Sequence, residues 1–181
     1  MIARFRPEIH GWPFTNFFPV RNWFAYGLCG GMVFSALDCY YYDVPIPEVE
    51  SPSPQIWRYL VKRQLASMKP SDMLAMFGMM MLPIEDVRRY VHGQLWQTAM
   101  ATFPQPLLLV RTRRWLKPHF NHQVLAIRST ASRIYIYDPN YPKMEVWLNY
   151  HDDHVDHCFE GDLVGIHIQD YREPSKPPVW R

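Results

Sequence analysis

The chain has 181 residues, of which 48% are hydrophobic and 20% are charged, and its formal net charge is +2 at pH 7. This balance is typical of a folded globular protein, and a chain of this length can bury a sizeable core in one domain. The small net charge gives no electrostatic reason to expect a nucleic-acid partner or a membrane surface, so neither is predicted.

The cysteines and the N-terminus indicate a reducing compartment. Three cysteines, at positions 29, 39 and 158, show no regular spacing, which argues against a disulfide framework. The first residues lack the apolar region of a signal peptide, and no apolar run approaches the roughly 18 residues of a membrane span. We therefore expect a cytoplasmic protein, with export by a leaderless route left open.

Helices are predicted for the first half of the chain. An aromatic, irregular lead-in contains a short extended piece at 12–18, and a helix follows from about Cys29 to Tyr41. Apolar residues at helical spacing give this helix a buried stripe, which comprises Val33, Phe34, Leu37 and Tyr41. A further helix is predicted at about 54–68, with Ser53 as its N-cap. Two more are predicted at 73–81 and 84–100. The inward residues of the last are Val87, Tyr90, Val91, Leu95 and Met100.

Strands are predicted after Pro104, where the periodicity changes. They cover residues 107–110, 123–128, 133–138, 144–148 and 163–168. Helices followed by an antiparallel sheet form the α+β class. We expect one domain over 1–181, with a helical part at about 29–100, a sheet part at about 104–171 and an irregular Pro-rich tail at 172–181.

Cys29 is the candidate nucleophile. It stands at the start of a predicted helix, where the macrodipole lowers the pKa of a thiol and raises its thiolate fraction. Gly27, Gly30 and Gly31 flank it and, having no Cβ, would let a substrate backbone approach the sulfur. The alternative is a buried structural thiol, which is the role we expect for Cys39.

His122 and Asp138 are the candidate partners of this thiol among eight histidines and 17 acidic residues. A hairpin centred on Thr130 would set them directly opposite each other on two strands, with Cβ atoms roughly 4.5–5.5 Å apart. Val124, Ala126, Ile134 and Ile136 would then share their face of the sheet. A β-bulge would slip this register.

Such a trio has a defined chemistry. A thiolate attacks a carbonyl, the histidine takes up and returns a proton, and the carboxylate orients the imidazole. The Cys29 N–H is a ready oxyanion donor at the helix start, and a side chain, Asn16 or Asn22, would supply a second donor.

Three blocks of the sequence resemble papain-like cysteine peptidases, and most closely small bacterial papain-like proteins of mostly unassigned role. The blocks are Gly27-Leu28-Cys29-Gly30-Gly31-Met32, Asn121-His122-Gln123-Val124-Leu125-Ala126 and Tyr137-Asp138-Pro139-Asn140. The resemblance implies a helical part that carries Cys29 as nucleophile and an antiparallel sheet that carries His122 as general base and acid. Asp138 would orient the imidazole, with Asn140 as the fallback. The chain departs from papain at Trp23, where papain has Gln, and at Asp138, where papain has Asn.

The stretch His151-Asp152-Asp153-His154-Val155-Asp156-His157-Cys158 offers nitrogen, oxygen and sulfur ligands that suit zinc. No familiar zinc spacing or second ligand cluster accompanies it, so we expect a solvated loop, no metal and no cofactor.

The predicted function is hydrolysis of amide or peptide bonds by a cysteine nucleophile through an acyl-enzyme intermediate, with a peptide or protein as substrate. One alternative is an amidase, deamidase or acyltransferase of the same fold, of the cell-wall or toxin type. Another is a non-catalytic binding module with a metal at 151–158. The sequence indicates no oligomeric state.

Overall fold

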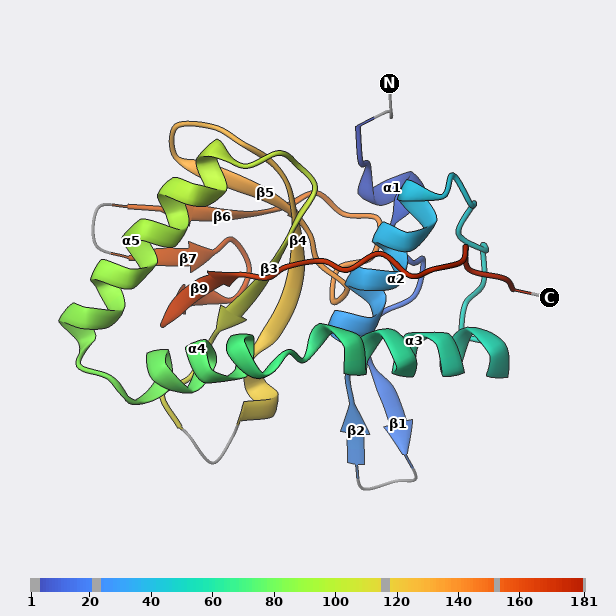
Figure 1. Ribbon diagram of the computed structural model, residues 1–181, viewed down its shortest axis with the longest axis horizontal. Coiled ribbons are helices and arrows are strands. Elements are labelled where there is room, and N and C mark those ends of the chain that lie inside the picture. Colours follow the sequence, from blue (N-terminus) through green and yellow to red (C-terminus); the bar gives the residue numbers. More distant parts are fainter. Residues whose placement is uncertain (1–3, 21–23, 115–117, 152–153, 181) are drawn as a thin grey trace.

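The computed structural model describes residues 4–20, 24–114, 118–151 and 154–180 (Figure 1). Its helices are α1 (Pro7–His10), α2 (Cys29–Tyr41), α3 (Pro54–Ser67), α4 (Pro70–Met81) and α5 (Ile84–Met100). A small hairpin is formed by β1 (Phe18–Val20) and β2 (Phe24–Tyr26). The main sheet contains β3 (Gln105–Val110), β4 (His122–Ser129), β5 (Arg133–Tyr137), β6 (Val146–Tyr150), β7 (Val155–His157), β8 (Gly161–Leu163) and β9 (Gly165–Ile168). No helix in the described ranges is both long and apolar enough to cross a bilayer.

The main sheet is antiparallel throughout and curls on itself. Its seven strands have the order β8-β7-β6-β5-β4-β3-β9. The two outer strands, β8 and β9, are consecutive in the chain and only Val164 separates them. The Val164 N–H donates to the Val110 carbonyl of β3 at 2.8 Å. The outer strands therefore lie near each other, and the sheet approaches a closed barrel.

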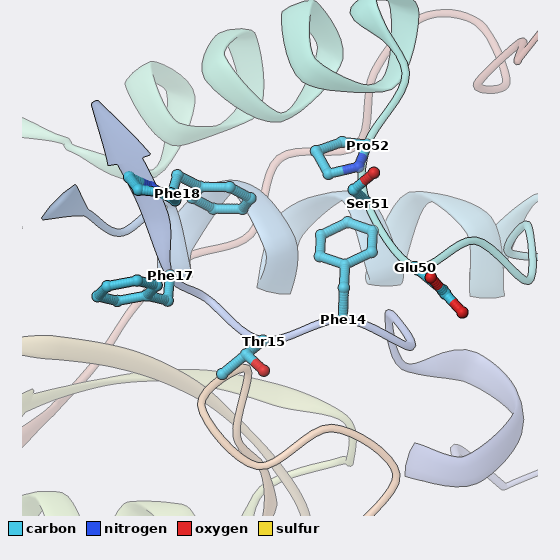
Figure 2. A pocket seen from close by; sticks show the side chains of 8 residues that line it. Phe14, Thr15, Phe17, Phe18, Glu50, Ser51 and Pro52 are labelled. Carbon is cyan, nitrogen blue, oxygen red and sulfur yellow. The ribbon is translucent and has the colours of Figure 1, made fainter. Parts of the chain in front are cut away.

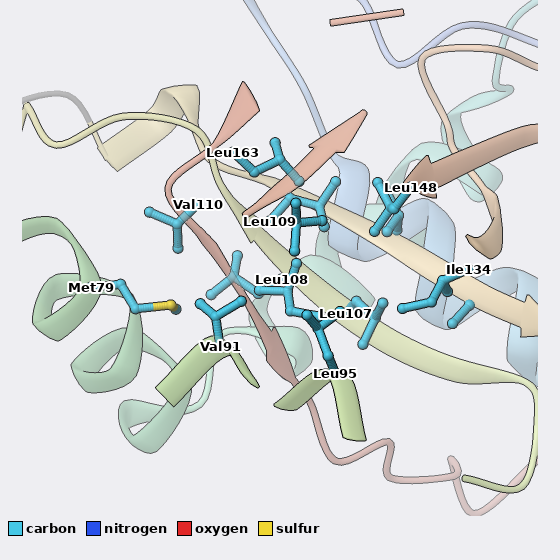
Figure 3. Close-up of a cluster of buried hydrophobic side chains, with 14 of the residues drawn as sticks. Met79, Val91, Leu95, Leu107, Leu108, Leu109, Val110, Ile134, Leu148 and Leu163 are labelled. Carbon is cyan, nitrogen blue, oxygen red and sulfur yellow. The ribbon is translucent and has the colours of Figure 1, made fainter. Parts of the chain in front are cut away.

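Two hydrophobic cores meet at β4, because successive residues of a strand point to opposite faces. One core joins the main sheet to α4 and α5 and includes Val124 and Ala126 (Figure 3). The other surrounds α2 and includes Leu125 and Ile127. Figure 1 shows the consequence, with the sheet between α5 and α2. Strand β4 is thus fixed from both sides, and its first residue is His122.

Aromatic residues of the lead-in and the tail hold α2 in place. The Trp12 ring is fully buried, and its Nε1–H donates to Ser35 Oγ at 2.8 Å. The backbone N–H of Trp12 donates to the Tyr137 hydroxyl at 3.1 Å. The irregular tail runs across α2 (Figure 1), and Trp180 packs edge-on against Trp12. Helix α2 is therefore enclosed by segments from both ends of the chain.

The glycines after Cys29 serve helix packing. Gly30 and Gly31 are buried. A Cβ on Gly30 would overlap the side chains of Gln123 and Ser67, and one on Gly31 would overlap the Leu60 carbonyl of α3. The expectation that these two glycines open a path for substrate is replaced by this packing role, because only Gly27 of the three is exposed.

We expect Gly31→Ala to destabilise the fold by about 1–3 kcal/mol, the usual cost of overpacking a close contact. The matched control is Gly93→Ala in α5, where an added Cβ meets nothing within 4 Å. That change should stabilise the helix by about 0.5–1 kcal/mol. Urea unfolding of both variants measures the two effects, and equal shifts would contradict the packing role of Gly31.

The predicted helices agree with the structure in position and less well in orientation. Helix α2 has the predicted bounds, and Ser53 Oγ caps α3 by accepting the Ile56 N–H at 3.3 Å. The inward orientation predicted for Tyr41, Tyr90 and Met100 is wrong, since they are 37%, 37% and 67% exposed. Tyr41 and Met100 are the last residues of their helices. The apolar spacing of the sequence continues to these positions, but the packed part of each helix ends before them.

Three predictions for extended segments are corrected. Of the piece predicted at 12–18, only Phe18 lies in a strand. The strand predicted at 163–168 is divided between the two outer strands, with Val164 between them. The loop predicted within 151–158 contains β7, whose three residues are too few to show a recognisable alternation.

Candidate active site

Cys29 is the first residue of α2, with Leu28 as the N-cap residue. The first N–H groups of a helix have no partner within it and face whatever lies beyond the helix end. Cys29 is half-buried, whereas the helix after it is buried from Gly30 to Cys39. The thiol therefore sits where an otherwise enclosed helix reaches the edge of the packed interior.

His122 and Asp138 are in direct contact. His122 Nε2 lies 2.6 Å from Asp138 Oδ1, and the two side chains are 4% and 0% exposed. The strand register differs from the prediction, because Leu125 pairs with Tyr137. Continuing this pairing places Asp138 across from Val124 and diagonal to His122, rather than directly opposite it. Diagonal neighbours on one face remain within reach of long side chains.

A β-bulge in β4, between Ala126 and Arg128, makes this contact possible. Between the bulge and the hairpin turn, Arg128 pairs with Tyr135. If this register continued to position 138, Asp138 would lie across from Leu125, on the opposite face of the sheet from His122. The bulge shifts the pairing by one residue, which returns Asp138 to the face of His122. A local irregularity thus sets the geometry of the pair.

The imidazole of His122 also contacts the thiol. Its Nε2 is bound to Asp138, and its interaction with the Cys29 side chain is the largest influence that lowers the pKa of the thiol. The structure therefore brings Cys29, His122 and Asp138 into one line of interacting side chains, from a helix start, a strand start and the turn after β5.

The electrostatics of this line favour a charged thiolate and imidazolium. Burial acts to raise the pKa of Cys29, but the hydrogen bond and charge of His122, with backbone hydrogen bonds from Gln123 and Gly30, hold it below its ordinary value. Burial acts to lower the pKa of His122, and the charge and hydrogen bond of Asp138 raise it to about 10. Both shifts are in the direction that favours a thiolate beside an imidazolium.

The Asp138 carboxylate is surrounded by hydrogen-bond donors. Oδ1 accepts from the Asn140 N–H at 2.7 Å as well as from His122, and Oδ2 lies 3.2 Å from His157 Nε2. Burial acts to raise the pKa of Asp138, but the charge and hydrogen bond of His122, with the hydrogen bonds of His157 and Asn140, keep it well below its usual range. The carboxylate is therefore ionised whenever the protein is folded near neutral pH.

Sequence reasoning missed His157, which it grouped with the possible metal ligands of 151–158. The sequence gives no clear signal for it, because β7 has only three residues; in the structure Val155 and His157 are buried and Asp156 between them is not. Residues two apart on a strand share a face, so an inward Val155 implies an inward His157.

The asparagines predicted for this region have different surroundings. Asn16 Oδ1 accepts the Leu28 N–H at 2.5 Å, and its Nδ2 donates to Asn140 Oδ1 at 3.2 Å. Asn140 contacts Asp138 through its backbone and Asn16 through its side chain, so its side chain does not take the orienting position. Asn22 lies outside the described residues.

The other two cysteines differ from Cys29. Burial and the charge of Asp38 raise the pKa of Cys39 far above its ordinary value. Burial also raises the pKa of Cys158. No disulfide forms, since all three are free thiols. Cys29 is the one whose surroundings favour the thiolate.

A second group of ligand-type side chains lies at the tip of the β6–β7 hairpin. One ligand atom from each of His151, His154 and Asp156 lies within 4.8 Å of the others. The two imidazoles are stacked, with ring centroids 4.4 Å apart. His157 and Cys158 do not belong to this group, so only part of the 151–158 stretch, which the sequence predicts to be a solvated loop, converges.

A hollow of about 440 Å³ opens beside the lead-in (Figure 2). It is lined by Phe14, Thr15, Phe17, Phe18, Pro19, Glu50, Ser51 and Pro52. None of Cys29, His122 and Asp138 lines it. Asn16 lies between two lining residues and bonds to Leu28, so one wall of the hollow is tied to the backbone just before Cys29.

Comparison of the chain with protein-family models, with curated proteins and with solved structures finds no match. The chemistry of the site is therefore the basis on which a function is assigned.

Proposed function

We propose that the protein is a thiol hydrolase of amide or peptide bonds, with a papain-like arrangement in which Cys29, His122 and Asp138 form the triad. The observation that carries this proposal is the buried hydrogen bond between the His122 imidazole and the Asp138 carboxylate, together with the lowering of the Cys29 pKa by the same imidazole. The mixed fold supports it, because a helix that begins at the thiol packs against the antiparallel strand that begins at the histidine. A peptide or protein is the proposed substrate, and the cytoplasm the proposed location.

The chemistry follows from the charge distribution. The Cys29 thiolate attacks the carbonyl carbon of the scissile amide, and the carbonyl oxygen becomes an oxyanion. The His122 imidazolium gives its proton to the leaving nitrogen, the C–N bond breaks, and a thioester with Cys29 remains. His122 then removes a proton from water, the hydroxide attacks the thioester, and the C–S bond breaks to release the carboxylic acid product and restore the Cys29 thiolate beside the His122 imidazolium. Throughout these steps Asp138 remains hydrogen-bonded to Nε2 of the His122 imidazole.

The oxyanion requires donors at the helix start. The Cys29 N–H is the proposed first donor, since the N-terminal N–H groups of a helix lack partners within it. Asn16 remains the proposed second donor. Its amide is held at Leu28, the residue directly before the thiol, and one of its two N–H groups is committed to Asn140.

An acyl-enzyme trap tests the proposal. Wild type and Cys29→Ala are incubated with a panel of peptides and muropeptides, quenched in acid and weighed by intact mass spectrometry. We expect products and a thioester adduct on Cys29 in the wild type and neither in the variant. Hydrolysis by Cys29→Ala at the wild-type rate would contradict the proposal. An acceptor other than water in the second step would identify an acyltransferase, and release of ammonia a deamidase, through the same adduct.

The rate of hydrolysis is expected to depend on pH as a broad bell. On the acid side the rate falls as the thiolate takes up a proton, at a pH below the ordinary pKa of about 8.5 for a thiol. On the alkaline side it falls as the His122 imidazolium loses its proton, at a pH near 10. A profile of kcat/KM against pH measures both limbs. Activity that only begins to rise above about pH 8.5, the ordinary thiol value, would be inconsistent with the thiolate–imidazolium pair.

A second candidate function, a metal-binding module, is favoured by the convergence of His151, His154 and Asp156. Two imidazoles and a carboxylate are a ligand set that suits zinc. Protein loaded with one equivalent of Zn²⁺ and then dialysed should retain the metal in the wild type and lose it in His151→Ala if this function is correct. Equal loss from both proteins would rule it out.

A further inference from the structure

We propose that His157 is a positioning residue that holds the Asp138 carboxylate in the orientation that His122 needs. This inference rests on the proposed function, since it assigns a role within the same site. It adds a fourth side chain, from a strand that the sequence did not reveal, to the line that begins at Cys29.

The surroundings of His157 fix its tautomer. Its Nδ1 accepts the backbone N–H of Phe159 at 3.2 Å, and its Nε2 lies 3.2 Å from Asp138 Oδ2. A neutral imidazole has one N–H donor and one acceptor nitrogen. Because Nδ1 accepts, Nε2 carries the proton and donates it to the carboxylate.

The imidazole of His157 has no freedom to turn away. Its side chain is 0% exposed, and the Tyr141 ring packs over it with centroids 5.7 Å apart. On the backbone, His157 pairs with Leu148 of β6, which pairs in turn with Ile134 of β5. Strand β7, two strands away from β5, therefore places the imidazole next to Asp138 on the core side of the sheet.

This arrangement requires a carboxylate at position 138. Oδ1 accepts from His122 and from the Asn140 N–H, and Oδ2 accepts from His157. An asparagine amide could accept hydrogen bonds only at its oxygen. Its NH₂ group, in place of the other carboxylate oxygen, would face a second donor instead of accepting from it. A side chain that is ionised accepts at both oxygens, and each charge-assisted bond limits its rotation. His157 thus accounts for the acid at this position.

The test uses Asp138→Asn, His157→Gln, His157→Leu and the double variant Asp138→Asn with His157→Gln. A glutamine amide can donate to the native carboxylate, and after turning over it can accept from the amide of the altered residue 138. The readout is the rate of Cys29 alkylation by iodoacetamide across pH 5–9, which reports the thiol pKa. Thermal unfolding of each variant reports its fold separately.

We expect Asp138→Asn and His157→Leu to slow alkylation at pH 6 by about tenfold, the effect of a rise of one unit in the thiol pKa. His157→Gln should stay within about threefold of wild type, on the same scale. The double variant should be faster than Asp138→Asn alone, which a merely structural histidine would not produce. A double variant no faster than Asp138→Asn, or a His157→Leu profile equal to wild type, would overturn the inference.

Two further readouts keep the result decisive. In the wild type, ¹⁵N shifts should show that the neutral imidazole of His157 carries its proton on Nε2, whether or not the variants fold. A proton on Nδ1 would overturn the inference. The wild-type alkylation profile separates the two claims, because an ordinary thiol pKa at Cys29 contradicts the proposed function, whereas a lowered pKa with no effect of His157 contradicts this inference alone.

Discussion

Replacing His122 by alanine should slow the alkylation of Cys29 at pH 6 by about 100-fold or more, the effect of a rise of at least two units in the thiol pKa. The reason is that His122 supplies the hydrogen bond and charge that oppose burial of the thiol. Without the imidazole, burial and the helix remain, and burial alone raises a thiol pKa above about 8.5. Rates of iodoacetamide labelling, followed by peptide mapping across pH 5–10, measure the change.

His119→Ala is the matched control for this experiment. His119 lies three residues earlier, in the short 3₁₀ helix Pro118–Phe120, and is exposed. Its removal should leave the alkylation profile unchanged. If His122→Ala stays within about threefold of wild type at pH 6, the imidazole does not activate the thiol.

Replacing Arg63 by methionine should destabilise the fold by about 3–5 kcal/mol, the usual cost of removing one partner of a buried ion pair. Arg63 Nε lies 2.8 Å from Asp38 Oδ2, with side chains 6% and 0% exposed. The hydroxyls of Tyr59 and Tyr171 donate to the same carboxylate at 2.8 and 2.6 Å. Loss of the guanidinium leaves a buried carboxylate with two neutral donors only.

This ion pair ties together the elements around the site. Asp38 lies in α2, the helix that begins at Cys29, and Arg63 lies in α3. Arg63 Nη2 also donates to the Arg172 carbonyl at 2.8 Å, which anchors the tail. Urea unfolding measures the change, and Arg58→Met, an exposed position of the same helix, should shift stability by less than about 0.5 kcal/mol. A loss below about 1 kcal/mol for Arg63→Met would show that Asp38 does not need the charge.

The sequence predicts the elements that carry strong local signals. Helix α2 is predicted with its bounds because its apolar residues recur at helical spacing. The contact of His122 with Asp138 is predicted although the predicted register is wrong. The true register differs by two residues near the site, and a shift of two preserves the face on which a side chain lies.

Features that depend on packing between distant segments could not be predicted. Strand β7 has three residues, two of them polar, and its pairing with β6 and β8 is not encoded in its own pattern. The role of Gly31 depends on the Leu60 carbonyl, which a different helix supplies. The bulge in β4 has no glycine to mark it, so the register near Asp138 is visible only in three dimensions.

The acid at position 138, where papain has an amide, has a physical explanation that depends on a distant strand. The sequence alone gives no reason for an acid at this position. In the structure, His157 donates to Oδ2 while His122 lies against Oδ1, and only a carboxylate accepts from both. The sequence places His157 among candidate metal ligands because of its neighbours His151, His154 and Asp156, which do converge in the structure.

The most direct test of the central claim is competitive alkylation of the wild-type protein. The folded protein is treated with a limiting amount of iodoacetamide at pH 6–7, and the modified cysteines are identified by mass spectrometry. Cys29 is expected to be labelled well before Cys158 and Cys39, because its pKa is lowered while theirs are raised. If Cys29 reacts no faster than the other two cysteines, it is not an activated nucleophile, and the proposed hydrolase function is wrong.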